Sequence, residues 1–227
     1  MIKQTLALMG LTLALSANAA IVTVFGDDVK FTYDDSTLFG NAITVGNSIF
    51  FLPTDFRAES TNGQGAVLVS DTLNITAEIT TAGYEMTNFT LVEQGDYELS
   101  AGDTSVTASA RLQVVSETKQ CGYFPCFVSD IDNVGGLSSV GATTDWSANS
   151  TIDLADTNGW GSDTLATLQL QNNLSATTLN NGESAWIQKK FNGIGMEVEV
   201  TSVPVPGAVW LFTSALIGLA GVKRSRK

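Results

Sequence analysis

The chain has only two cysteines, Cys121 and Cys126, and it contains no histidine. The lack of histidine excludes Ser-His-Asp and Cys-His catalysis and any zinc site with imidazole ligands. The C-x4-C spacing closes a short loop, so we expect a Cys121–Cys126 disulfide and not a redox-active C-x-x-C dithiol. Such a loop would present Tyr123 and Phe124 at the surface or pack them inward. The remaining chemistry is that of carboxylates, a Ser-Lys dyad or a metal with oxygen ligands.

Acidic residues cluster in two segments that read as turns. Asp130 and Asp132 flank Ile131, and Asp153 is followed by Asp156. Ca²⁺ prefers carboxylate and carbonyl oxygens, so calcium binding is a hypothesis for both segments, although neither matches an EF-hand loop. The alternative is that these are solvated surface carboxylates.

An enzyme of this composition would have to use paired carboxylates. A glycoside hydrolase needs two carboxyl groups facing each other across a sugar, one with a raised pKa. Acidic pairs such as Asp27-Asp28 and Asp34-Asp35 arise by chance in a chain with 23 acidic residues. We therefore predict no catalytic residues, no enzyme and no cofactor other than the calcium of the hypothesis above.

The tryptophans suggest a different kind of site. Flat aromatic faces suit the apolar faces of sugars, and Trp146, Trp160 and Trp186 are the candidates for such a platform, together with Tyr123. Trp160 stands in an Asn-Gly-Trp-Gly segment and is the best candidate for exposure. Trp186 lies between Ala185 and Ile187 in an expected strand. The alternative for each of them is a place in the core.

The elements that would position these residues are strands. Apolar and polar residues alternate with period two, which predicts half-buried strands in four segments: 73–79, 106–114, 166–170 and 196–200. Segments 84–91 and 95–99 are expected to form two strands joined by a turn at residues 93–96. The Gly- and Ser-rich stretch 135–141 is expected to be a long loop.

Short strands separated by Gly, Asn and Asp turn signals predict a mostly β chain with a β-sandwich or jelly-roll-like single domain over residues 21–202. A split into two domains near residues 135–141 is the alternative.

The N-terminal segment reads as a signal peptide over residues 1–20. Lys3 is followed by an apolar stretch and by small residues at Ala17, Ala19 and Ala20, where signal peptidase would cut. The chain would then be exported to a compartment where disulfides persist.

The C-terminal residues 203–227 have three parts. Val203-Pro204-Val205-Pro206-Gly207 precedes an apolar stretch of 15 residues from Ala208 to Val222, and the chain ends with Lys223, Arg224, Ser225, Arg226 and Lys227. Counted from Val203, the apolar run is 20 residues, which is within the length of a transmembrane helix. The basic end would stay in the cytoplasm, which places the upstream domain across the membrane.

This layout resembles the PEP-CTERM sorting signal, in a variant with valine and a second proline around the usual motif. The resemblance implies that an exosortase-type membrane protease cuts near the prolines. It also implies association with exopolysaccharide, biofilm or cell aggregation. An ordinary single-span anchor is the alternative for this tail.

Between the ends, residues 21–203 carry all 23 acidic residues and 6 basic ones, a net charge of −17. This charge argues against nucleic-acid binding, because phosphates require a basic surface. We expect a non-enzymatic cell-surface or extracellular-matrix protein. The alternative is a carbohydrate-binding β-sandwich module, with or without the help of calcium.

Overall fold

The computed structural model describes residues 20–157 and 159–203, which form two antiparallel sheets. Residues 1–19 of the predicted signal peptide and residues 204–227 of the predicted sorting tail lie outside the described residues. The first sheet, in spatial order, contains β1 (Ile21–Phe25), β2 (Val29–Asp34), β6 (Gly65–Ile79), β11 (Leu165–Thr178), β8 (Ser105–Cys121) and β9 (Phe124–Val134). The second contains β10 (Thr144–Asp153), β7 (Tyr84–Leu99), β12 (Ser184–Ser202), β4 (Ser48–Leu52) and β3 (Asn41–Val45), and β5 (Arg57–Thr61) also pairs with β12. A short 3-10 helix, η1, spans Leu154–Asp156.

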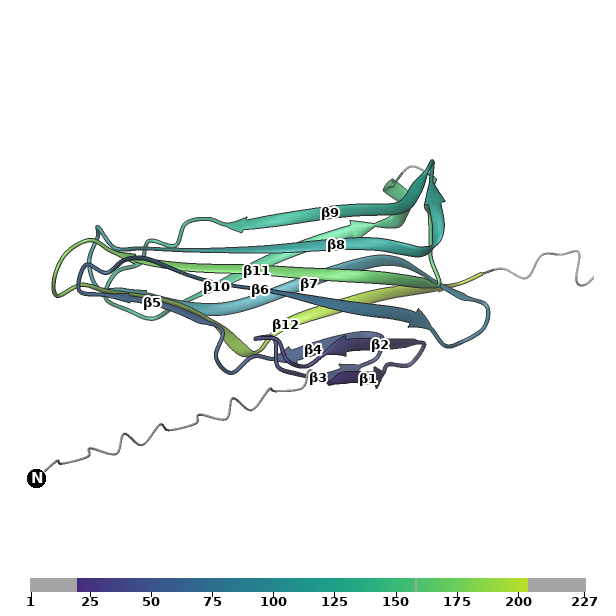
Figure 1. Ribbon diagram of the computed structural model, residues 1–227, viewed down its shortest axis with the longest axis horizontal. Coiled ribbons are helices and arrows are strands. Elements are labelled where there is room, and N and C mark those ends of the chain that lie inside the picture. Colours follow the sequence, from purple (N-terminus) through teal and green to yellow (C-terminus); the bar gives the residue numbers. More distant parts are fainter. Residues whose placement is uncertain (1–19, 158, 204–227) are drawn as a thin grey trace, which may run out of the picture.

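The long strands run along the longest axis of the molecule, and the short strands β1–β4 gather beside one end of them (Figure 1). Their inward side chains form one apolar cluster between the two sheets. In β11, for example, Leu168, Leu170 and Leu174 are fully buried while Gln169, Gln171 and Asn173 lie at the outer face. Each such leucine contributes about 1.5–3 kcal/mol through burial. The strands predicted at residues 73–79, 106–114, 166–170 and 196–200 are confirmed, within β6, β8, β11 and β12.

The turn predicted at residues 93–96 is wrong, because β7 runs without interruption from Tyr84 to Leu99. Gly95 lies inside this strand for a packing reason. A Cβ atom there would come within 2.4 Å of the Trp146 ring and 2.1 Å of the Gln188 carbonyl oxygen. The glycine therefore lets the indole of the neighbouring strand lie directly on the β7 backbone.

Two aspartates connect the edges of the two sheets. Asp130 Oδ2 accepts a hydrogen bond from the Thr151 backbone N–H at 3.2 Å, and Asp132 Oδ2 accepts one from the Asn149 N–H at 2.9 Å. Thr151 and Asn149 belong to β10 and the aspartates to β9, which are end strands of their sheets. Unpaired N–H groups at a sheet edge invite pairing with another chain, and here carboxylates occupy two of them.

Candidate functional site

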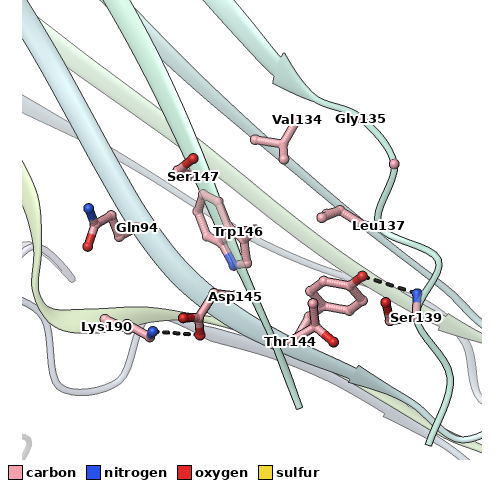
Figure 2. Close-up of a pocket in the computed structure, with 12 residues that line it drawn as sticks. Gln94, Val134, Gly135, Leu137, Ser139, Thr144, Asp145, Trp146, Ser147 and Lys190 are labelled. Atoms are coloured by element: carbon pink, nitrogen blue, oxygen red, sulfur yellow. Dashed lines mark hydrogen bonds and ion pairs between the residues drawn. The ribbon is translucent and has the colours of Figure 1, made fainter. Parts of the chain in front are cut away.

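A hollow of about 510 Å³ lies where the first half of β10, the second half of β7 and the loop after β9 meet (Figure 2). Its lining is mixed. Trp146 and Leu137 supply apolar surface, Gly135 and Gly136 supply backbone, and the polar groups come from Gln94, Ser139, Thr144, Asp145, Ser147 and Lys190. A concave surface with one aromatic ring and several polar groups is the general form of a small-ligand site.

The loop wall of the hollow is held by hydrogen bonds to β7. The Ser139 backbone N–H donates to the Tyr97 hydroxyl oxygen at 3.1 Å, and the Gly141 N–H donates to the Leu99 carbonyl at 2.8 Å. The stretch 135–141 is thus a loop, as predicted, but one with fixed attachments. Across the hollow, Lys190 Nζ lies 2.6 Å from Asp145 Oδ1 (Figure 2). Asp145 is largely exposed, so this ion pair contributes little to stability and remains available to a polar ligand.

Trp146 is a wall of this hollow and not an exposed platform. Its residue surface is only 5% exposed, because the ring packs over Gly95. Its Nε1 is buried and has no hydrogen-bond partner among the described residues. The ring lies against the Gly95 backbone, and Lys189 Nζ lies 4.7 Å from its centroid, so it offers no open face for stacking.

Trp160 is also buried, at 4% exposure, which overturns the expectation that its glycine-rich loop would expose it. Its Nε1 donates a 2.9 Å hydrogen bond to Asp163 Oδ2, three residues further on. This loop folds back onto the end of β8, where Ser116 and Thr118 bond the same carboxylate. The indole is therefore part of a buried structural network.

Trp186 is the aromatic residue whose orientation sequence reasoning missed. Ala185 and Ile187 are fully buried, so Trp186 points to the outer face of β12. The Arg57 guanidinium lies 4.3 Å from its ring centroid, and Arg57 Nη1 donates to Gln188 Oε1 at 2.9 Å. Extending the period-two alternation through residues 185–187 would have predicted this outward position.

The four calcium candidates do not come together. Asp130 and Asp132 bond the edge of β10, Asp153 Oδ1 accepts the Ala155 N–H at the start of η1, and Asp156 is exposed. In the part of the chain that the structure describes, no group of three or more acidic or cysteine side chains could hold a metal ion. The described residues therefore contain no preformed site that would support the calcium hypothesis.

The cysteines form a disulfide between Cys121 and Cys126, at the tip of the β8–β9 hairpin. Tyr123 and Phe124 point outward there, with 97% and 71% of their surface exposed. Phe127 is also exposed, further along β9. The aromatic side chains of the disulfide loop are therefore at the surface and do not pack inward.

Of the predicted sorting residues only Val203 is described, and it follows the end of β12 with its N–H donating to the Gly83 carbonyl at 2.7 Å. Pro204, Val205, Pro206, Gly207 and the basic end lie outside the described residues, as do Ala17 and Ala19. Over residues 20–157 and 159–203, no helix has the length and apolar character needed to cross a bilayer.

Comparison with known proteins assigns no family. No protein-family model matches the chain, and no curated protein matches it. Two solved structures of infectious bursal disease virus, from the Gt and Gx strains, are similar over 88% and 84% of this chain, at 11% and 12% identity and TM-scores of 0.28 and 0.29. The chain spans about half the length of these viral chains, 53% and 49%.

Proposed function

We propose that this is an exported, non-enzymatic protein of the cell surface or extracellular matrix, sorted by an exosortase-type protease and associated with exopolysaccharide. The observation that carries the proposal is the order of proline motif, apolar stretch and basic end in residues 203–227. In this proposal, the domain is a single jelly-roll-like β-sandwich that lies between a signal peptide and a transmembrane sorting helix.

Three features of the described residues support export. The first strand begins at Ile21 and the last ends at Ser202, next to the two predicted processing junctions. The Cys121–Cys126 disulfide suits an oxidising compartment. The net charge of −17 over residues 21–203 keeps such a domain soluble and self-repelling.

The test is intact-mass measurement and fractionation of the full chain, produced with the exosortase-type protease of its host. We expect a surface or medium species that lacks residues 1–20 and the segment beyond about Pro206. A double variant, Pro204→Ala with Pro206→Ala, should remain unprocessed, whereas Thr213→Ala within the apolar stretch should be processed normally. A natural chain that stays in the membrane and retains Lys227 would instead be an ordinary anchored protein.

Carbohydrate binding is the second candidate function, and the hollow beside β10 is the observation that favours it. Its polar groups, among them the accessible Asp145–Lys190 ion pair, could form hydrogen bonds with the hydroxyl groups of a sugar. Stacking of a sugar on the face of Trp160 is excluded from this candidate function, because that ring is buried.

The lectin candidate predicts that Asp145→Ala weakens glycan binding about tenfold, the loss expected for one charge-assisted hydrogen bond. Binding would be measured on a glycan array and by tryptophan fluorescence. Asp153→Ala, at the far end of the same strand, is the matched control and should bind like the natural chain. Absence of any glycan signal from the natural chain would eliminate this candidate.

A further inference from the structure

Three polar side chains point into the apolar core between the sheets. Glu93 comes from β7, Lys189 from the neighbouring β12, and Asn172 from β11 in the opposite sheet. Glu93 and Asn172 are fully buried, and the Lys189 side chain has no exposed surface. All three occupy inward positions of the strand alternation, where apolar residues normally stand.

The Glu93 carboxylate lies next to both of the other groups. Lys189 Nζ donates to Glu93 Oε2. The Asn172 amide is close enough to favour the charged form of the same carboxylate. Yet neither amide atom of Asn172, nor Glu93 Oε1, has the geometry of a hydrogen bond to any partner among the described residues. One carboxylate thus stands beside a lysine amine and an unpartnered asparagine amide.

A buried ion pair accounts for only two of these residues. Glu93 and Lys189 can compensate each other, although burial makes such pairs poor sources of stability. An amide buried without partners costs about 1–3 kcal/mol. An unlinked Asn172 side chain therefore lowers the stability of the core, whereas Leu170 and Leu174, on either side of it in β11, fill the core without this cost.

The surroundings favour uncharged forms of the pair. Burial lowers the pKa of the Lys189 amine and raises the pKa of Glu93, in each case outweighing the attraction between them. Lys189 Nζ lies 4.7 Å from the Trp146 ring centroid and 5.9 Å from that of Phe56, so aromatic rings take the place of water. A neutral lysine amine is a nucleophile.

We propose that Lys189 and Asn172 join through an intramolecular isopeptide bond, with Glu93 as the proton carrier. Lys189 Nζ attacks Asn172 Cγ while the protonated Glu93 polarises the amide oxygen. Glu93 then takes a proton from the attacking nitrogen and delivers one to Nδ2. The Cγ–Nδ2 bond breaks, ammonia leaves, and Glu93 ends in its starting protonation state. No oxidation occurs and no other reactant is needed.

The product is a covalent link between β11 of one sheet and β12 of the other. It removes the buried unpartnered Nδ2 and converts the buried lysine amine into a neutral amide that cannot be protonated. The inference rests on the core alone and holds whether or not the chain is sorted as proposed above.

The test is mass spectrometry of the natural full chain after reduction, unfolding and digestion with a protease that cuts after Glu and Asp. Such cleavage places Asn172 in peptide 164–183 and Lys189 in peptide 184–197. We expect the two peptides as one linked species, lighter than their sum by one ammonia, with fragmentation locating the bond at Asn172 and Lys189. Recovery of both peptides only in separate, unmodified form would overturn the proposal, and this result does not depend on how any variant folds.

Matched variants then assign the roles. Lys189→Arg and Asn172→Ala should abolish the linked species, and Glu93→Gln should reduce it to an undetectable level. Lys190→Arg and Asn173→Ala are the controls and should keep it, because Lys190 pairs with Asp145 and Asn173 bonds Ser109, both away from the core. A linked species in Lys189→Arg would overturn the site, and one in Glu93→Gln would overturn the role of Glu93.

Discussion

An Asp163→Ala variant is expected to be less stable than the natural chain by about 3–5 kcal/mol, because it leaves several buried donors without an acceptor. Asp163 is fully buried. Its Oδ2 accepts from the Ser116 hydroxyl and Trp160 Nε1, and its Oδ1 accepts from the Thr118 hydroxyl and the Leu165 N–H. The measurement is the free energy of unfolding in urea. Asp156→Ala, at an exposed position of the same segment, is the control and should change it by less than about 0.5 kcal/mol.

The same carboxylate predicts a pH dependence. Burial raises the pKa of Asp163, but the hydrogen bonds from Ser116, Thr118 and Leu165 outweigh it and hold the pKa below its ordinary value. The folded pKa is thus lower than the unfolded one of about 3.9. The stabilisation is complete above about pH 4 and is lost as the pH falls through the folded pKa. Asp163→Asn cannot titrate, so its stability deficit should shrink below pH 4. A deficit that is the same at every pH would contradict the assignment.

A Gly95→Ala variant is expected to lose about 3 kcal/mol, which is near the upper end for overpacking by one methyl group. The added Cβ would overlap the Gln188 carbonyl oxygen in β12 and the Trp146 ring in β10, so two strand pairings must shift. Tryptophan fluorescence should change together with the stability, because the Trp146 indole can no longer pack directly on the β7 backbone. The measurement is the thermal midpoint together with the emission spectrum.

Gly102→Ala is the matched control for this substitution. Nothing lies within 4 Å of a Cβ atom at Gly102, so its effect should stay within about 0.5 kcal/mol. Equal stability of the Gly95 and Gly102 variants would show that Trp146 does not rest on β7.

Alternation found the strands because each has one face in the core, where a shift of one residue would expose the whole apolar set. It failed at Gly95 because a glycine followed by aspartate marks either a turn or a close approach of a neighbour. Only the pairing of β10 with β7 shows that the neighbour is Trp146. The disulfide could be predicted because its loop is local in the sequence.

The candidate sites depended on contacts between distant segments. Trp160 is buried because its loop returns to β8, and no pattern near residue 160 signals this. Asn172 carried a readable signal, as a polar residue between two inward leucines. That it meets Glu93 and Lys189 depends on the pairing and packing of three strands, which the sequence alone does not determine.

The last strand, β12, lies between other strands of its sheet before it ends. Its 19 residues span roughly 60 Å, with β7 along one side and with β5 at residues 184–188 and β4 at residues 194–197 on the other. A force pulling Ser202 along the strand axis would load these hydrogen bonds together in shear, whereas an edge strand can be peeled away one bond at a time. The C-terminal end of the described fold should therefore resist such a force better than a strand at the edge of a sheet would.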